Sequence, residues 1–313
     1  MNRVGYWCNA IAHYALPAAM WRTGGRRLLL QLTDSELEAI EHRVAHYVRL
    51  RPCEHALPTR IGDFKYPFGA KPRHSLYFFD LYEVLSRFDA DLRFAYLFGD
   101  ITHEPDVASL VKSRPIVSGP TNSAVMKLDA LRHFRFVNDH RPFRAKSDML
   151  VSRNWVTQEH RRLLLSMYAH HPLCDVGKIN CDANEAHPEW VKPFMSVDQQ
   201  LDYKFISCIE GNDVATNLKW VMSSNSLAVT PKPRYETWYM EGTLVGGVHY
   251  VEVRPDYSDL IEKLEYYMTH TDEAEQILAN AHDYVSQFRD KRLELATQLL
   301  TARAYFEQTG QQV

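Results

Sequence analysis

The sequence is short of cysteine and contains no Cys-x-x-Cys pair. Its cysteines are odd in number and scattered, at Cys8, Cys53, Cys174, Cys181 and Cys208. Such a set indicates neither a disulfide framework nor a zinc ribbon. No group of histidines has metal-ligand spacing either. We therefore expect reduced thiols in a cytoplasmic protein without a metal site.

Long apolar runs and an excess of basic residues are also missing. No stretch approaches the roughly 18 apolar residues needed to span a bilayer, and Pro17, Arg22 and Arg26 interrupt the apolar core that a signal peptide would need. The formal net charge of −3 argues against broad nucleic-acid binding, which requires a basic surface. The length of 313 residues is enough for two globular domains.

The N-terminal 30 residues combine aromatic and apolar side chains with basic ones. They include Trp7, Tyr14, Met20 and Trp21 beside Arg3, His13, Arg22, Arg26 and Arg27. Aromatics next to arginines suit a peripheral contact with anionic lipid headgroups. A helix packed on its own domain is an equal alternative, and the sequence leaves both open.

Short apolar runs alternate with amphipathic stretches along the chain. The runs predict strands at residues 93–98, 115–117, 134–137, 149–152, 205–209, 226–229 and 248–253. Helices are predicted at 32–47, where Thr33 and Glu36 form a capping-box pattern, and at 79–88, 160–170, 196–203, 214–223, 235–241 and within 258–308. This alternation predicts an α/β architecture with two doubly wound halves and a ligand in the cleft between them.

The domain boundary is expected in residues 138–147, which are polar and basic and contain a proline. The expected domains are 1–145 and 146–313, with the last helix as a candidate to pack back on the first. Residues 52–73 are rich in proline, glycine and charge. They predict an exposed loop region, either shaping an acceptor pocket or forming a plain solvated connection.

Residues 203–231 form the most informative stretch. An apolar run is followed by a polar turn at 210–213, a helical segment and a second apolar run. In such a unit the helix N-terminus points to the carboxyl edge of a parallel sheet, where its N–H groups can bind phosphate. Most such turns bind nothing, so the pattern alone gives only a candidate site.

Four ordered blocks carry a resemblance to a known family. They are YKFISCIEGNDVATNLKW from residue 203, SSNSLAV from 223, KPRYETWYMEG from 232 and VHYVEVRPDYSDL from 248. This region resembles the signature region of glycosyltransferase family 90, which includes protein O-glucosyltransferases, capsule xylosyltransferases and bacterial lipopolysaccharide core-biosynthesis enzymes. EGNDVATNLKW and the HHPLCDVG run at 170–177 are similar to the bacterial branch. The resemblance extends over roughly residues 90 to 290.

The resemblance implies a GT-B fold, in which two Rossmann-like domains face each other across a cleft. The nucleotide-sugar would bind mainly to the C-terminal domain and the acceptor mainly to the N-terminal one. It also implies inversion at the anomeric carbon, a UDP-sugar as the donor substrate, and neither a metal nor a cofactor.

By the same resemblance Asp100 is the general base that takes the proton of the acceptor hydroxyl. The local run Gly99-Asp100-Ile101-Thr102 departs from the family pattern. An aspartate after a glycine also commonly serves as a turn or capping residue.

The leaving diphosphate is expected to be stabilised by Arg153 and Arg161, which keep the spacing of the family's arginine block. Asn154 stands where that block has glycine. Salt bridges are the alternative role for both arginines.

Further donor-binding residues follow from the resemblance. They are Gly211, Ala215, Thr216, Asn217, Lys219 and Glu236. Asn217 replaces an arginine of better-known relatives, and Lys219 also suits a solvated helix position. Glu236, expected near the start of a helix, would accept both ribose hydroxyls, with a cap or salt bridge as its alternative role.

The sequence thus predicts an inverting transferase that moves a sugar from a UDP-sugar to lipopolysaccharide core oligosaccharide at the cytoplasmic face of the inner membrane. The alternatives are a transferase acting on capsule, another glycan or a protein, and a non-catalytic nucleotide-sugar-binding module.

Overall fold

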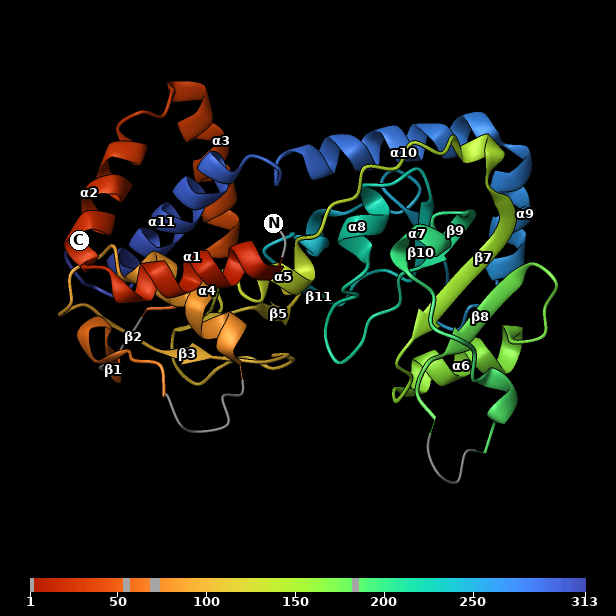
Figure 1. Cartoon of the computed structure of the whole chain (residues 1–313), viewed down its shortest axis with the longest axis horizontal. Helices are drawn as coiled ribbons and strands as arrows, with labels where there is room; N and C mark the ends of the chain where they lie inside the picture. The colour runs from red at the N-terminus through yellow and green to blue at the C-terminus, as the bar shows by residue number, and fades with distance from the viewer. Residues whose placement is uncertain (1–2, 53–56, 68–73, 182–185) are drawn as a thin grey trace. The chain divides into compact units, whose positions relative to one another are not determined.

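The computed structural model describes residues 3–52, 57–67, 74–181 and 186–313. The chain forms two compact units: unit 1 is Met1–His133, Arg234–Gly242 and Phe288–Val313, and unit 2 is Phe134–Pro233 and Thr243–Gln287 (Figure 1). Residues 53–56 and 68–73 of the loop region predicted to shape an acceptor pocket lie outside the described residues. No helix in the described part of the chain is both long and apolar enough to cross a membrane.

Unit 2 is built on a five-stranded sheet in which all neighbouring strands are parallel. Its order is β12-β10-β9-β7-β8, with β12 Val251–Glu252, β10 Leu227–Thr230, β9 Tyr203–Ser207, β7 Ser147–Asn154 and β8 Cys174–Lys178. In chain order this is the doubly wound pattern 5-4-3-1-2, and the direction of winding reverses between β7 and β9. The predicted α/β class is confirmed.

The helices of unit 2 cover the sheet. They are α6 Glu159–Tyr168, α7 Val197–Gln200, α8 Leu218–Met222, α9 Leu260–Thr269 and α10 Thr271–Ser286. Helix α6 packs on β8, α9 on β7, and α10 on α8 and β10. Because helices cover the sheet, β10 is buried along its whole length rather than at alternate residues.

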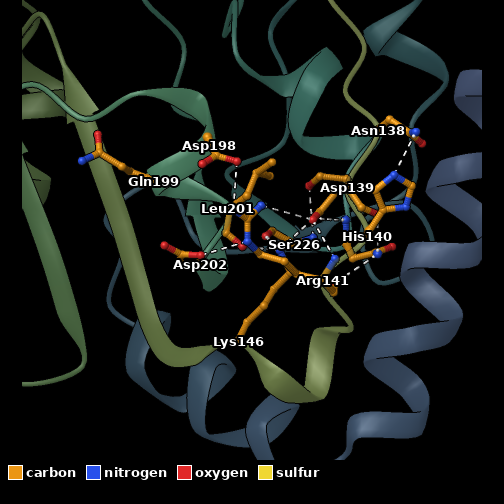
Figure 2. Close-up of polar contacts among 12 residues, drawn as sticks. Asn138, Asp139, His140, Arg141, Lys146, Asp198, Gln199, Leu201, Asp202 and Ser226 are labelled. Carbon is orange, nitrogen blue, oxygen red and sulfur yellow. Dashed lines mark hydrogen bonds and ion pairs between the residues drawn. The ribbon is translucent and has the colours of Figure 1, made fainter.

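A buried ion pair between Lys146 and Asp139 connects the start of unit 2 to the amino edge of its sheet (Figure 2). Lys146 Nζ lies 2.8 Å from Asp139 Oδ2 and 2.9 Å from Ser226 Oγ, and it also donates to the carbonyl of Leu201. Lys146 immediately precedes β7 and Ser226 immediately precedes β10, while Leu201 lies two residues before β9. The polar stretch at 138–147 is therefore held in place here, and the opposite, carboxyl edge of the sheet carries the longer loops.

The described residues of unit 1 form three small sheets. Parallel strands β3 Tyr96–Leu97, β4 Ser109–Val111 and β6 Ser123–Val125 form the first, in that order. Antiparallel pairs form the other two: β1 Thr59–Arg60 with β2 Arg93–Phe94, and β5 Ser113–Pro115 with β11 Tyr235–Thr237. The β5–β11 pair joins residues more than one hundred positions apart, so local patterns could not predict it.

The helices of unit 1 are α1 Arg3–Ala15, α2 Ala18–Leu29, α3 Asp34–Tyr47, α4 Ser75–Leu85, the short α5 Ala130–His133, and α11 Lys291–Gln308. Both hydrogen bonds of the predicted capping box between Thr33 and Glu36 begin α3. Helix α11 packs on α2, α3 and α4. Its Glu294 is buried and accepts from Lys127 Nζ at 2.5 Å and from Trp238 Nε1 at 2.9 Å.

Several predicted elements are wrong. Residues 235–241 are not a helix: they contain β11 and the start of a 3-10 turn, Glu241–Thr243, because pairing with β5 replaces local helix formation. Residues 134–137 form no strand. Residues 93–98 are divided between β2 and β3, which belong to different sheets.

Candidate functional site

The carboxyl edge of the unit 2 sheet has a switch point between β7 and β9, where loops leave neighbouring strands in opposite directions. Ligands of open α/β sheets bind in the crevice outside such a point. The loop after β7 begins at Trp155, and the loop after β9 runs from Cys208 to Asn217. Most of the predicted donor-binding residues lie in or beside these two loops.

Arg161, near the start of α6, ties the two loops together. Its Nη1 donates to Trp155 O at 2.7 Å, while Nε donates to Glu210 O and Nη2 to Ile209 O, both at 2.9 Å. Burial lowers the pKa of Arg161 from the usual arginine value. A guanidinium carries more N–H groups than these three contacts use. Arg161 can therefore hold both loops and still donate to an anion.

Gly211 lies directly against this guanidinium. A Cβ added at Gly211 would sit 3.3 Å from Arg161 Nη2, which is tighter than ordinary contacts. The neighbouring His160 also lies within hydrogen-bond distance of the loop, with Nε2 2.8 Å from Glu210 O. The first turn of α6 thus determines the path of the loop after β9. His160 was not singled out from the sequence, since a histidine beside two arginines has no distinctive pattern.

Arg153, the penultimate residue of β7, is occupied by protein acceptors. Its Nη2 donates to both carboxylate oxygens of Asp175 at 2.9 Å, its Nη1 to the carbonyls of Ser152 and Asp175, and its Nε to Pro193 O at 3.1 Å. Every N–H of the guanidinium therefore has an acceptor. Contact with a diphosphate would require Arg153 to exchange one of these partners.

The helix predicted at 214–223 is only partly present. α8 begins at Leu218 and ends at Met222, so Ala215, Thr216 and Asn217 precede it in a turn. One turn of helix aligns too few peptide dipoles to attract phosphate strongly. Asn217 instead donates from Nδ2 to Ser207 O at 2.9 Å, which holds the end of β9 to this turn.

Lys219 is fully buried, so the alternative of a solvated helix position is excluded. Its charge acts on Cys208, the first residue after β9. Burial raises the pKa of the Cys208 thiol, and the positive charge of Lys219 opposes that rise.

Trp155 is the most conspicuous residue that the sequence did not identify. Its side chain is 63% exposed although it follows a buried strand. Phe194 and Ile179 are exposed nearby: Ile179 N donates to Asn154 O at 3.0 Å, and Pro193 O accepts from Arg153. An exposed tryptophan at the switch point offers a stacking surface for a ring. Its position after β7 was the available signal.

Unit 1 has its own polar cluster, at the carboxyl ends of β3, β4 and β6. Asp100 follows β3, Lys112 follows β4, and Arg132 lies in α5 after β6. Lys112 Nζ is 2.6 Å from Asp100 Oδ1, and Arg132 Nη2 is 4.0 Å from the same oxygen. The Lys112 side chain is 1% exposed and that of Asp100 29%, so the carboxylate faces solvent from a rigid, positively charged support. The sequence identified only Asp100.

Glu236 lies in unit 1, on β11. Its Oε1 accepts from Arg114 Nε at 2.8 Å, and its Oε2 is 2.9 Å from His46 Nε2. Burial by itself raises the pKa of Glu236, but the hydrogen bond to His46 and the charge of Arg114 lower it below the usual value. A Cβ at Gly242 would fall 2.7 Å from Oε2, so glycine is needed there. With a side chain 1% exposed, Glu236 could meet a ribose only by exchanging a partner.

Among the described residues, no group of three or more histidine, cysteine, aspartate or glutamate side chains could hold a metal ion.

Comparison with known proteins places these features in a family. The model of the family described as "Glycosyl transferase family 90" matches residues 134–302. The chain is 44% identical over 268 residues to "O-glucosyltransferase LpsA" of Dichelobacter nodosus, covering 86% of this chain and 83% of that protein. It is also 34% identical over 99 residues to "Uncharacterized protein 035R" of Invertebrate iridescent virus 3, covering 31% of this chain and 9% of the viral protein. The chain belongs to glycosyltransferase family 90 and is a glycosyltransferase.

Proposed function

We propose that the protein is an inverting transferase that moves a sugar from a UDP-sugar to lipopolysaccharide core oligosaccharide. The relative named O-glucosyltransferase LpsA makes glucose the first sugar to consider. The observation that carries the proposal is the support of Asp100. A buried lysine holds this solvent-facing carboxylate at the carboxyl edge of parallel strands, where α/β enzymes place their working residues.

In the proposed reaction Asp100 accepts the proton of an acceptor hydroxyl. The hydroxyl oxygen attacks the anomeric carbon of the donor as the bond to UDP breaks, and UDP leaves with the electron pair of that bond. One displacement inverts the configuration at the anomeric carbon. Lys112 favours the ionised form of Asp100, the form a general base needs.

Donor binding is proposed at the switch point of unit 2. Arg161 and Lys219 would offset the charge of the leaving diphosphate, together with Thr216 and the backbone of the turn beginning at Gly211. Arg153, Ala215 and Asn217 would support this turn and its strand ends. Trp155 would stack on the uracil ring. No metal is assigned to the reaction.

Glu236 keeps its proposed contact with the ribose hydroxyls, subject to the exchange of partners described above. If the acceptor is lipid-linked, the transfer takes place at a membrane surface. We propose that this surface is the cytoplasmic face of the inner membrane. No nucleic acid is proposed as a partner.

A UDP-release assay tests the proposal. Purified protein is incubated with UDP-glucose, UDP-galactose or UDP-xylose and core oligosaccharide, and free UDP and the product linkage are measured. Acceptor-dependent UDP release with inverted anomeric configuration is expected. If the protein binds the donor but releases no UDP with any core, capsule or peptide acceptor, the binding-module alternative would be favoured. Release with capsule or peptide acceptors alone would favour the other transferases.

A further inference from the structure

Helix α1 is apolar on two opposite faces. Tyr6, Ala10 and His13 are buried, and α1 packs on α4, where Tyr6 Oη donates to Asp80 Oδ1 at 2.7 Å. The helix therefore does pack on its own unit, as one of the two sequence interpretations held. A helix that needed only this contact would carry polar residues on its other side.

The other side of α1 is apolar and exposed. Val4, Cys8, Ile11 and Ala15 follow each other at intervals of four, three and four residues, which places them on one stripe. Val4 is 71% and Ile11 60% exposed, and Leu16 and Met20, which follow in the turn after α1 and in the first turn of α2, are exposed as well. We call Val4, Cys8, Ile11, Ala15, Leu16 and Met20 the apolar face.

The segment that carries this face has charged side chains of one sign only. The sequence has no aspartate or glutamate before Asp34, while the chain as a whole has a net charge of −3. Arg3, Arg26 and Arg27 are exposed. Burial lowers the pKa of His13 to about 3, so this histidine is neutral and the arginines carry the charge.

We propose that the apolar face of α1 and α2, with Arg3, Arg26 and Arg27, binds the surface of a bilayer containing anionic phospholipid. Exposed aliphatic side chains insert at the level of the headgroups, and guanidinium groups pair with lipid phosphates. A second copy of this chain is a poorer occupant. It would bring the same arginines to the interface and, from this segment, no acidic residue to meet them.

Flotation with vesicles tests the proposal on the full chain. Vesicles of phosphatidylglycerol and phosphatidylcholine are compared with pure phosphatidylcholine. We expect binding to the anionic vesicles that falls about 30-fold in Arg26→Ala/Arg27→Ala, since each basic residue contributes about 1 kcal/mol near such a surface. Lys291→Ala/Arg303→Ala removes two exposed charges from α11 and should bind as the wild type does.

The apolar contribution is tested by Ile11→Glu against Ile11→Leu. The glutamate should abolish flotation, and the leucine should preserve it, with circular dichroism and thermal unfolding showing that both variants are folded. Absence of wild-type binding to anionic vesicles, or equal binding by Ile11→Glu, would overturn the proposal. Self-association that Ile11→Glu abolishes, without vesicle binding, would assign the face to a second copy.

Lipid binding by this face is independent of the transfer reaction, so the two can fail separately. Asp100→Asn should float with anionic vesicles like the wild type. Ile11→Glu should retain UDP release with a soluble core oligosaccharide.

Discussion

The ammonium group of Lys112 lies 2.6 Å from Asp100 Oδ1, and the two residues follow adjacent parallel strands. The lysine is buried and its Nζ also lies 5.9 Å from the ring centre of Tyr77. Because a side chain confined in this way has few alternative rotamers, it positions the carboxylate as well as pairing with its charge. The carboxylate of Asp100 is therefore held by the buried Lys112 and is itself partly exposed to solvent.

Replacing Asp100 by asparagine should reduce turnover by about 10²–10⁴-fold, the usual contribution of a general base. UDP-sugar affinity should stay unchanged, because the proposed donor residues lie elsewhere. UDP release and calorimetric donor binding measure the two effects. Asp106→Asn, an exposed carboxylate of the same loop, is the matched control and should keep wild-type turnover. Turnover retained by Asp100→Asn would remove the assignment of the base.

Lys112→Met should keep the volume of the buried side chain and lose its charge. We expect kcat to fall by roughly 10-fold or more, since an unsupported base is misplaced by side-chain motion. The KM for the donor should change little. Arg132→Ala, which removes the more distant cation, should have a smaller effect on kcat. A kcat equal to that of the wild type in Lys112→Met would show that the ion pair serves only the fold.

Arg161→Ala should weaken donor binding and loosen the loops after β7 and β9. Loss of hydrogen bonds from a charged donor to three carbonyls should lower the free energy of unfolding by roughly 2–4 kcal/mol. Arg161→Lys should recover only part of this, because an ammonium cannot reproduce the planar guanidinium geometry. Arg162→Ala is the control, since Arg162 is exposed beside it. Donor affinity and thermal unfolding are the measurements, and equal donor affinity in all three variants would contradict a role at the site.

Trp155→Ala should weaken UDP binding by about 1–3 kcal/mol, the range for stacking of a base on an aromatic side chain. Trp155→Phe should retain most of the affinity. Neither change should affect thermal stability, because the indole is largely exposed. Quenching of tryptophan fluorescence by UDP in the wild type, absent in Trp155→Phe, gives a direct readout. Unchanged UDP affinity in Trp155→Ala would place the nucleobase elsewhere.

Asp80 makes a prediction about pH and stability. Burial raises its pKa to about 7, above the ordinary value of 3.8 that applies in the unfolded chain. Between these values the folded protein binds a proton that the unfolded chain has released, so stability falls as the pH rises from 4 to 7. The loss at neutral pH is on the order of 4 kcal/mol.

Asp80→Asn should remove this dependence. The amide can still accept from Ala130 N and can donate to the Tyr6 hydroxyl, which replaces the bonds of the carboxylate. The free energy of unfolding by urea, measured from pH 4 to 8, should fall less steeply in Asp80→Asn than in the wild type. Parallel curves for the two proteins would contradict the raised pKa.

The sequence by itself determined the elements whose information is local. The α3 capping box needs only Thr33 and Glu36 three residues apart, and strand β7 and helix α6 follow from their apolar patterns. The family also followed from sequence, because its blocks are continuous runs of residues. Asp100 was predicted as the base in the same way, from a short run after an apolar strand.

Tertiary structure decided what these residues touch. Pairing of β11 with β5 across more than one hundred residues turned a predicted helix into a strand and buried Glu236 against Arg114. The support of Asp100 by Lys112 and the use of Arg161 as a link between two loops depend on which strand ends are neighbours in a sheet. Local patterns report propensity and amphipathicity within a few residues. Partners of a side chain are set by long-range packing, whose free energy exceeds local preference.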